Sequence, residues 1–227
     1  MLKSYVKRTG YFTGAQRKAY NELSCKYLIP VLFDNETQVF DGAELNFNAV
    51  FNNCNDVIME IGFGSGAATA QIAKDNTGKN YLGIEVHKPG IGRLLWEIEK
   101  NNLSNIRIIE FDAMIAVSKL IKEGSLGAIH IFFPDPWPKK RHHKRRLIQK
   151  PFTNTLAGCL KQGGYIYMVT DWEDYGLRAL EELSLTKTLK NAYDGFAEAQ
   201  AWRPKTRFEQ KGLDKNHVIR ELLFIKG

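Results

Sequence analysis

The chain has 227 residues, of which 44% are hydrophobic, enough for one large domain with a packed core. Its three cysteines stand far apart and lack the paired spacing of a zinc or iron–sulfur site, which favours a reducing compartment. No apolar run is long enough to cross a bilayer, and no signal peptide is recognisable at the N-terminus. We therefore expect a cytoplasmic protein, and the five histidines, which lack ligand spacing, predict no metal site.

The net charge of +7 is concentrated in one segment of the chain. Between residues 136 and 170 there are eight Lys or Arg residues and no Asp or Glu, so the remainder of the chain sums to about −1. A solvated helix face usually mixes acids with bases, whereas a localised basic strip is typical of a polyanion site. The distribution favours a nucleic-acid partner.

Residues 1–50 read as a basic N-terminal extension, and residues 51–227 as the main domain. Apolar, β-branched runs in the main domain predict strands at residues 57–63, 80–86, 106–112, 126–133 and 165–171, with a final edge strand at 217–226. Between them, helices are predicted at residues 66–74, 92–102, 114–121, 144–160 with a break near Pro151, and 174–184. This alternation indicates an α/β, Rossmann-like fold with a mostly parallel sheet and helices on both faces. Two functions of the extension are possible from the sequence, namely that it binds RNA or that it closes over a cofactor.

Acidic residues follow the predicted strands at the points where they end. They are Glu60, Glu85, Asp112, Asp135 and Asp171. In parallel sheets, ligands bind beyond the carboxyl ends of the strands. A single acid there usually caps the next helix, but five acids predict a site lined with carboxylates.

The segment "EIGFGSGA" joins the first predicted strand to a helix, as a nucleotide-binding turn does. Its glycines are Gly62, Gly64 and Gly66. Glu85, at the end of the next strand, is placed to bond ribose hydroxyls. The pattern alone fits both a dinucleotide and S-adenosylmethionine. Glu60 precedes the glycines and would repel a pyrophosphate, whereas it favours a cationic methyl donor, whose adenine amino group we expect at Asp112.

Five segments resemble the bacterial tRNA (guanine-N7)-methyltransferase family and occur in the family's order. They are "EIGFGSG", "GIEVHKPG", "FFPDPWPKKRHHKRRL", "TDWEDY" and "RPKTRFEQKG". The resemblance implies a class I methyltransferase fold with a seven-stranded sheet and S-adenosylmethionine as cofactor. It also implies methylation at N7 of a guanine in the variable loop of tRNA, at position 46.

The resemblance implies a role for individual positions as well. The cofactor-binding positions are Glu60, Glu85, Asp112 and Asp135, and Asp135 also matches the proposed catalytic acid. The substrate-binding positions are Lys139, Asp171, Thr206, Arg207, Phe208 and Glu209. The RNA-binding positions are Arg141, His142, His143, Lys144, Arg145 and Arg146. The departures are that Arg207 stands where the family commonly has Lys and Lys211 where it commonly has Arg. Because Arg has a planar fork and Lys does not, the contact of Arg207 stays open.

The chemistry agrees with these residue types. Guanine N7 has a lone pair and no proton, so its attack on a sulfonium methyl needs no general base. Catalysis should rest on alignment, which contributes ~7–11 kcal/mol, with Asp135 orienting the base or steadying its positive charge. Glu209 and Asp171 are expected to accept hydrogen bonds from the guanine N1–H and amino group. Trp137 has two open interpretations, stacking on a base or packing the loop.

Two rival interpretations fit less well. An amino methyltransferase has two adjacent prolines, whereas Trp137 follows Pro136 directly. An inactive RNA-binding protein would keep the basic segment but lose the acids at the strand ends. We expect tRNA as the partner, no membrane, no obligate protein subunit, and a monomer or a homodimer.

Overall fold

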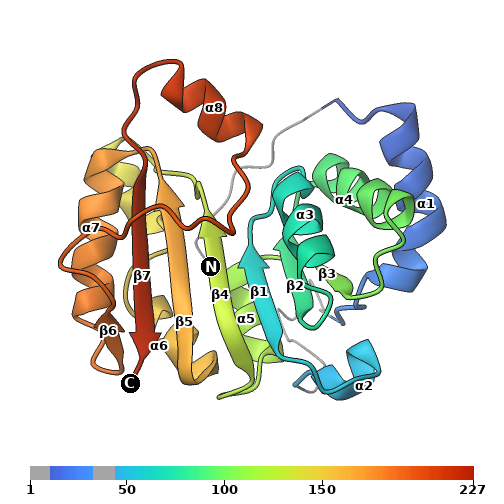
Figure 1. Ribbon diagram of the computed structural model, residues 1–227, viewed down its shortest axis with the longest axis horizontal. Coiled ribbons are helices and arrows are strands. Elements are labelled where there is room, and N and C mark those ends of the chain that lie inside the picture. The colour runs from blue at the N-terminus through green and yellow to red at the C-terminus, as the bar shows by residue number, and fades with distance from the viewer. Residues whose placement is uncertain (1–10, 33–43) are drawn as a thin grey trace.

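The computed structural model of the protein describes residues 11–32 and 44–227 (Figure 1). Its centre is a seven-stranded sheet with the order β3-β2-β1-β4-β5-β7-β6. The strands are β1 (Val57–Ile61), β2 (Asn80–Glu85), β3 (Ile106–Glu110), β4 (Leu126–Phe132), β5 (Leu160–Thr170), β6 (Leu189–Asn191) and β7 (Arg220–Lys226). Pairs among β1 to β5 are parallel, and β7 is antiparallel to both β5 and β6. The predicted α/β fold with a mostly parallel seven-stranded sheet is confirmed.

Helices cover both faces of the sheet (Figure 1). They are α1 (Gly14–Tyr27), α2 (Phe47–Phe51), α3 (Ala67–Asp75), α4 (Lys88–Lys100), α5 (Ala113–Leu120), η1 (Lys140–Arg145, a 3₁₀ helix), α6 (Phe152–Cys159), α7 (Glu173–Ser184) and α8 (Arg207–Leu213). Buried side chains of α1, α3 and α4 form one core with the sheet, and those of α5, α6 and α7 form the other. Because both faces are covered, all five residues of β1 are buried, which explains its continuous apolar run.

The final strand differs from the prediction. β7 does not lie at the edge of the sheet but between β5 and the short strand β6, which the sequence analysis missed. Three residues are too few to show the period-two alternation that identifies a strand. By contrast, the break predicted near Pro151 in the helical segment 144–160 is confirmed, because η1 ends at Arg145 and Pro151 is the N-cap of α6. Prolines are tolerated at a helix start but not inside a helix.

The described part of the first fifty residues packs onto the main body. α1 lies against α4 so closely that a Cβ on Gly92 would come within 2.4 Å of the Gln16 carbonyl oxygen. The Tyr20 hydroxyl donates to Glu110 at the end of β3, and the Ile29 N–H donates to the Ile108 carbonyl at 2.8 Å. The division at residue 50 stays a prediction. Of the basic residues that give the extension its charge, Lys3, Lys7 and Arg8 lie outside the described residues.

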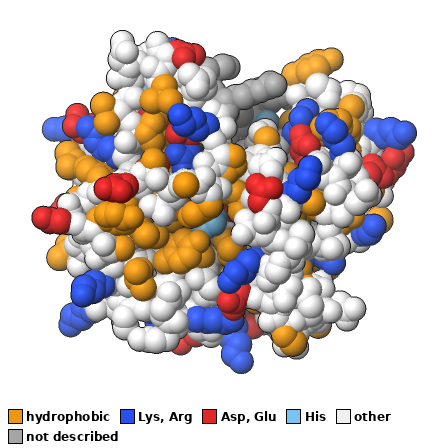
Figure 2. Space-filling model, in the orientation of Figure 1, with side chains coloured by type: hydrophobic (Ala, Val, Ile, Leu, Met, Phe, Trp, Pro, Cys, Tyr) orange, Lys and Arg blue, Asp and Glu red, His pale blue; other side chains and the backbone are white. Residues whose placement is uncertain are grey.

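One half of a sheet face carries no helix in Figure 1. Helices α1, α3 and α4 cover the β1–β3 half, whereas the loop between β6 and α8 crosses the β4, β5 and β7 half (Figure 1). Hydrophobic side chains gather on this half of the molecule in Figure 2. In the loop between β6 and α8, Trp202 is 39% exposed and stacks on His130, with the ring centroids 4.9 Å apart. The loop then leads to α8, at the edge where the parallel strands end (Figure 1). None of the described helices could span a membrane.

Candidate active site

A cavity of about 260 Å³ opens at the carboxyl ends of β1, β2 and β4. This is the edge at which open parallel sheets bind ligands, as the sequence predicts. Its polar lining consists of the glycine turn after β1, Glu85, His87 and Asp135, and its apolar lining includes Ile61, Ile84, Phe111, Phe133 and Leu147. Among the described residues that line it there is no Lys or Arg. This lining suits an uncharged or cationic ligand and does not suit a pyrophosphate.

The glycine turn has the backbone that its sequence predicts. Gly62, Gly64 and Gly66 all have positive φ angles, which favour glycine. Gly62 and Gly64 line the cavity, in agreement with the expected cofactor contact. Gly66 has another role, because it is the N-cap of α3 and packs so tightly that an added Cβ would lie 2.6 Å from the Leu94 Cβ.

Glu85 is held in place by the backbone around it. Its Oε2 accepts a hydrogen bond from the Gly64 N–H at 3.0 Å, and its Oε1 accepts from Val86 at 2.7 Å and His87 at 3.0 Å. Because a carboxylate has about four acceptor sites, a further site remains for the ligand. The geometry fits the predicted contact with ribose hydroxyls.

Glu60 does not line the cavity but is buried beneath the glycine turn. The Thr69 hydroxyl donates to it at 2.8 Å. Burial raises the pKa of Glu60 to about 7, the Thr69 bond opposes this rise, and the nearby charge of Glu85 adds to it. A cation bound in the cavity would favour the ionised form of Glu60, so its influence on a ligand is electrostatic.

Asp112 is the N-cap of α5, and its Oδ1 accepts from the backbone N–H groups of Met114 at 2.9 Å and Ile115 at 3.2 Å. Its neighbours Phe111 and Ala113 line the cavity, whereas Asp112 is not among the lining residues. The expectation that five acids line one site is therefore met in part. Glu85 and Asp135 line the cavity, and Asp112 at least shares the helix-capping role that a single acid usually has.

Asp135 lies on the wall of the cavity beside Phe133 and Pro134. The loop after it turns sharply, with Trp137 at a positive φ of 47°. Trp137 is buried, and the Arg145 guanidinium lies 4.9 Å from its ring centroid. Of the two interpretations of Trp137, the structure shows the packing one, because a buried ring offers no face to a base.

Arg146 differs from the expectation that it contacts RNA. It is buried, its Nε donates to the Pro136 carbonyl at 2.8 Å, and its guanidinium also pairs with Asp174 and lies over the Tyr175 ring. A guanidinium enclosed by protein groups cannot reach a phosphate. Arg146 instead anchors the loop that carries Asp135.

The rest of the basic segment is exposed or partly exposed. Lys139, Arg141 and Lys144 are exposed, and His142, His143 and Arg145 are partly exposed. Lys139 is the N-cap of η1 and the other five residues belong to η1, directly after the Asp135 loop. These side chains remain candidates for contact with a polyanion at the mouth of the cavity.

Three of the predicted substrate residues, Asp171, Thr206 and Glu209, already form hydrogen bonds with other protein groups. Glu209 is buried and accepts two hydrogen bonds from Arg203, at 2.7 and 2.8 Å. Thr206 caps α8 and forms a capping box with Glu209. Asp171 Oδ2 lies 2.9 Å from His217 Nδ1.

Phe208, like Lys139, is a predicted substrate residue whose side chain faces outward. It is 55% exposed, and its ring centroid lies 5.2 Å from that of Phe133 on the cavity wall. The side chain of Arg207 lies outside the described residues.

Several residues that build the site were missed by the sequence analysis. His87 and Phe133 line the cavity and lie two residues from the predicted residues Glu85 and Asp135, so their closeness in the chain could have identified them. Leu147, Arg203 and His217 reach the site through the tertiary fold, and no sequence pattern identified them.

Comparisons with known proteins agree with the predicted family. A family model described as "Putative methyltransferase" matches residues 54–222. The tRNA (guanine-N(7)-)-methyltransferase of Nitrosomonas eutropha is 46% identical over 226 residues, which cover 100% of this chain and 97% of that protein. That of Francisella philomiragia is 42% identical over 225 residues, which cover 99% and 95%.

Solved structures support the fold. The 16S rRNA methyltransferase KamB aligns with a TM-score of 0.60 at 12% identity, covering 84% of this chain and 97% of that one. TrmN from Thermus thermophilus aligns with a TM-score of 0.54 at 15% identity, covering 76% and 44%. These similarities concern the fold alone, whereas the full-length relatives and the family model confirm the resemblance seen in the motifs. The chain belongs to the tRNA (guanine-N(7)-)-methyltransferase family.

Proposed function

We propose that this protein transfers the methyl group of S-adenosylmethionine to N7 of a guanine in tRNA, giving N7-methylguanine and S-adenosylhomocysteine. The guanine that we propose lies in the variable loop, at position 46. The observation that carries this function is the cavity lined by Glu85 and Asp135 and free of Lys and Arg among its described residues, beside an exposed basic segment. The names of the full-length relatives support the choice of substrate.

The cavity residues would hold the cofactor at its two ends. S-adenosylmethionine supplies, when bound, a methyl group activated by a sulfonium. Glu85 accepts from the ribose hydroxyls, and the backbone at Gly62 and Gly64 permits close approach. Asp135 and, from beneath, Glu60 provide negative potential for the cationic part of the ligand.

The protein's contribution to methyl transfer is alignment. N7 needs no proton removed, so Asp135 orients the base and steadies the positive charge that develops on it. Phe133 and Phe208 offer an aromatic contact beside Asp135. Asp171 keeps capacity to accept from the guanine N1–H and amino group beside its His217 partner, because a carboxylate has about four acceptor sites. Glu209, which the sequence also predicts to contact the base, is buried and holds Arg203 through both oxygens, so we propose that it supports the start of α8.

The basic segment would hold the RNA by its phosphates. Lys139, Arg141 and Lys144 form its exposed part, and contacts of this kind position a nucleic acid without reading its sequence. His142, His143 and Arg145 lie between them and share this proposed role. We place the reaction in the cytoplasm, with the protein acting as a monomer or a homodimer and without an obligate protein subunit.

The test is to incubate the protein with unmodified tRNA and isotope-labelled methyl donor and to map the modified nucleotide. We expect one N7-methylguanine in the variable loop. A matched transcript with adenine in place of that guanine should take up no label. Label that persists in this transcript, or that maps to another nucleotide, would overturn the proposed position.

A further inference from the structure

A buried ion cluster joins α8 to the sheet, and it centres on Arg203. The guanidinium donates from Nη1 and Nη2 to the two oxygens of Glu209, at 2.7 and 2.8 Å. Nη2 also donates to Glu221 Oε1 at 2.8 Å, and Nε donates to the Tyr167 hydroxyl at 3.3 Å. Arg203, Glu209 and Glu221 are all buried. One guanidinium thus links the loop before α8, α8 itself and two strands.

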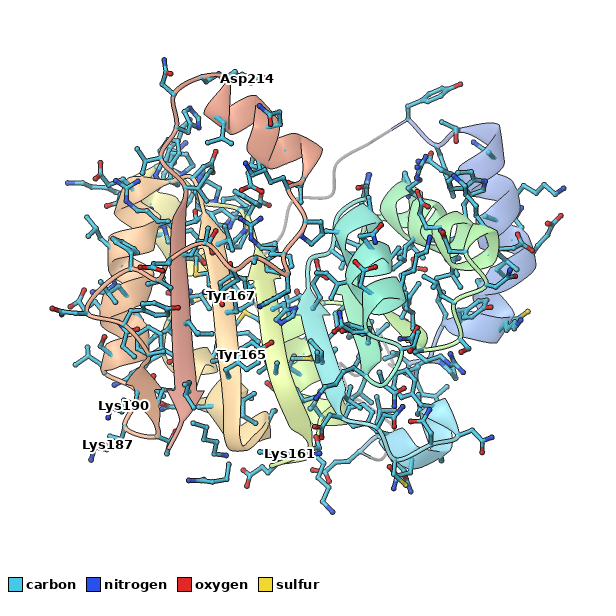
Figure 3. The ribbon with its side chains drawn as sticks, viewed as in Figure 1. Lys161, Tyr165, Tyr167, Lys187, Lys190 and Asp214 are labelled. Carbon is cyan, nitrogen blue, oxygen red and sulfur yellow. The ribbon has the colours of Figure 1, made fainter. Side chains whose placement is uncertain are left out.

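The strand side of the cluster is built on two paired strands. Tyr167 is on β5 and fully buried, and its hydroxyl donates to Glu221 on the neighbouring strand β7. Figure 3 shows Tyr167 on the sheet and Asp214 at the far end of α8, so the cluster connects the sheet with a helix that lies beyond its edge. Packed strands hold Tyr167 and Glu221 in fixed places, and Arg203 transmits this placement to Glu209.

The helix side of the cluster carries the proposed substrate residues. Glu209 forms the capping box of α8 with Thr206, and both of its oxygens are occupied by Arg203. Phe208, the residue before Glu209, lies against Phe133 on the cavity wall. Any shift of Glu209 would therefore move the start of α8 and the aromatic pair beside Asp135.

We infer that Arg203 is a positioning residue for methyl transfer, which fixes Glu209 and the start of α8 against the sheet so that the target base meets the cavity in the reactive orientation. The inference rests on the proposed function and extends it to a residue that does not line the cavity. Misplacement of reacting groups by about 1 Å can cost 10²-fold in rate, so such an anchor has a measurable effect.

Electrostatics give the inference a second readout. Burial raises the pKa of Glu209, but the hydrogen bonds and charge of Arg203 outweigh it, so the pKa of Glu209 lies below its ordinary value. The Thr206 N–H and the charge of Lys205 act in the same direction. Glu221 and Tyr167 face the cluster from β7 and β5. Without Arg203, burial would remain and the pKa of Glu209 would rise.

The experiment compares Arg203→Met, which removes the donors, with Arg203→Lys, which keeps the charge but loses the fork. We expect kcat for tRNA methylation to fall about 100-fold in Arg203→Met, with a smaller loss in Arg203→Lys. The KM for S-adenosylmethionine should stay within about twofold, because the cofactor cavity does not include Arg203. The acidic limb of the pH–kcat profile should move to higher pH in Arg203→Met, because Glu209 would stay protonated to higher pH when Arg203 is absent.

A matched control is Arg178→Met on α7, whose guanidinium pairs with Glu181 and Glu182 at half exposure. It should leave kcat and the pH profile unchanged. If Arg203→Met does not fold, as judged by cofactor binding, Glu221→Gln tests the inference in its place. This variant retains the Arg203–Glu209 hydrogen bonds and loses the ion pair between Arg203 and Glu221. We expect a kcat loss of about threefold to tenfold for Glu221→Gln with unchanged cofactor affinity.

Two kinds of result are contrary to the inference. The inference is overturned if the single variants Arg203→Lys and Glu221→Gln both keep the wild-type kcat. It is also overturned if Arg203→Met loses kcat while its pH–kcat profile stays where the wild-type profile lies. Failure of the proposed function looks different, because the wild-type protein itself would then leave tRNA unmethylated.

Discussion

The cofactor side and the substrate side of the site hold their carboxylates in different ways. On the cofactor side, three backbone N–H groups orient Glu85, which keeps acceptor capacity toward the cavity. On the substrate side, the Arg203 side chain occupies both oxygens of Glu209 within a buried cluster. Backbone donors follow directly from the local turn, whereas an arginine partner comes from elsewhere in the fold. An acid near the site can therefore be a ligand contact or an anchor, and its hydrogen-bond partners tell the two apart.

Asp135 stands between the two sides and gives the largest expected effect. Asp135→Asn should lower the single-turnover rate of methyl transfer about 10²–10³-fold, because the charge that steadies the cationic base is lost. Asp75→Asn, at the far end of α3, is the control and should leave the rate unchanged. A rate for Asp135→Asn within threefold of wild type would exclude the proposed role of this carboxylate.

Glu60 tests whether ionisation of a buried carboxyl on the cofactor side lowers the stability of the folded protein. Its pKa in the folded protein, about 7, exceeds the ordinary 4.5, so the folded state holds the proton to higher pH than the unfolded state does. The stability of the wild-type protein should then fall as pH rises from about 4.5 through 7. Relative to Glu60→Gln, the loss between pH 4.5 and pH 8 is about 3 kcal/mol. Urea unfolding at both pH values measures it, and parallel pH dependence of the two proteins would contradict the assignment.

Glu85 tests the ribose contact. Glu85→Gln should weaken S-adenosylmethionine binding by about 10- to 100-fold, because a charged acceptor is lost and one amide N–H₂ would face backbone donors. Calorimetric titration of the cofactor is the measurement. Glu99→Gln on the exposed part of α4 serves as the control. Equal affinity of Glu85→Gln and wild type would remove Glu85 from the binding site.

Changes in the basic segment should have the smallest effect on the protein, and they should separate the exposed Arg141 and Lys144 from the buried Arg146. The double change Arg141→Ala and Lys144→Ala should weaken tRNA binding and reduce the salt dependence of log K by about 1.5, at roughly 0.7–0.9 per phosphate contact. Arg146→Ala should leave that slope unchanged and lower the free energy of unfolding by about 1–3 kcal/mol, because the Pro136 carbonyl loses its donor. Filter binding across a salt series and urea unfolding separate the two outcomes. An equal loss of slope in Arg146→Ala would restore its expected RNA contact.

Much of the framework was predictable from sequence. The strands β1 to β5, the positive φ angles of the glycine turn and the position of Glu85 follow from local patterns, since hydrophobic period and glycine placement reflect the backbone conformation. Asp135 was predictable as a wall residue because it follows a buried strand. The strand β6 was not, since three residues carry no period.

The sequence by itself determined the alternating α/β order, the cofactor turn, the concentration of positive charge and the family. Only the tertiary structure decided which of the charged residues line the cavity. Arg146 turns inward to Pro136, and Glu209 is bound by Arg203 and linked through it to Glu221 on β7. The physical reason is that backbone conformation is set by near neighbours in the chain, whereas a buried charge must find its partner through space, and no spacing in the sequence records which partner it finds.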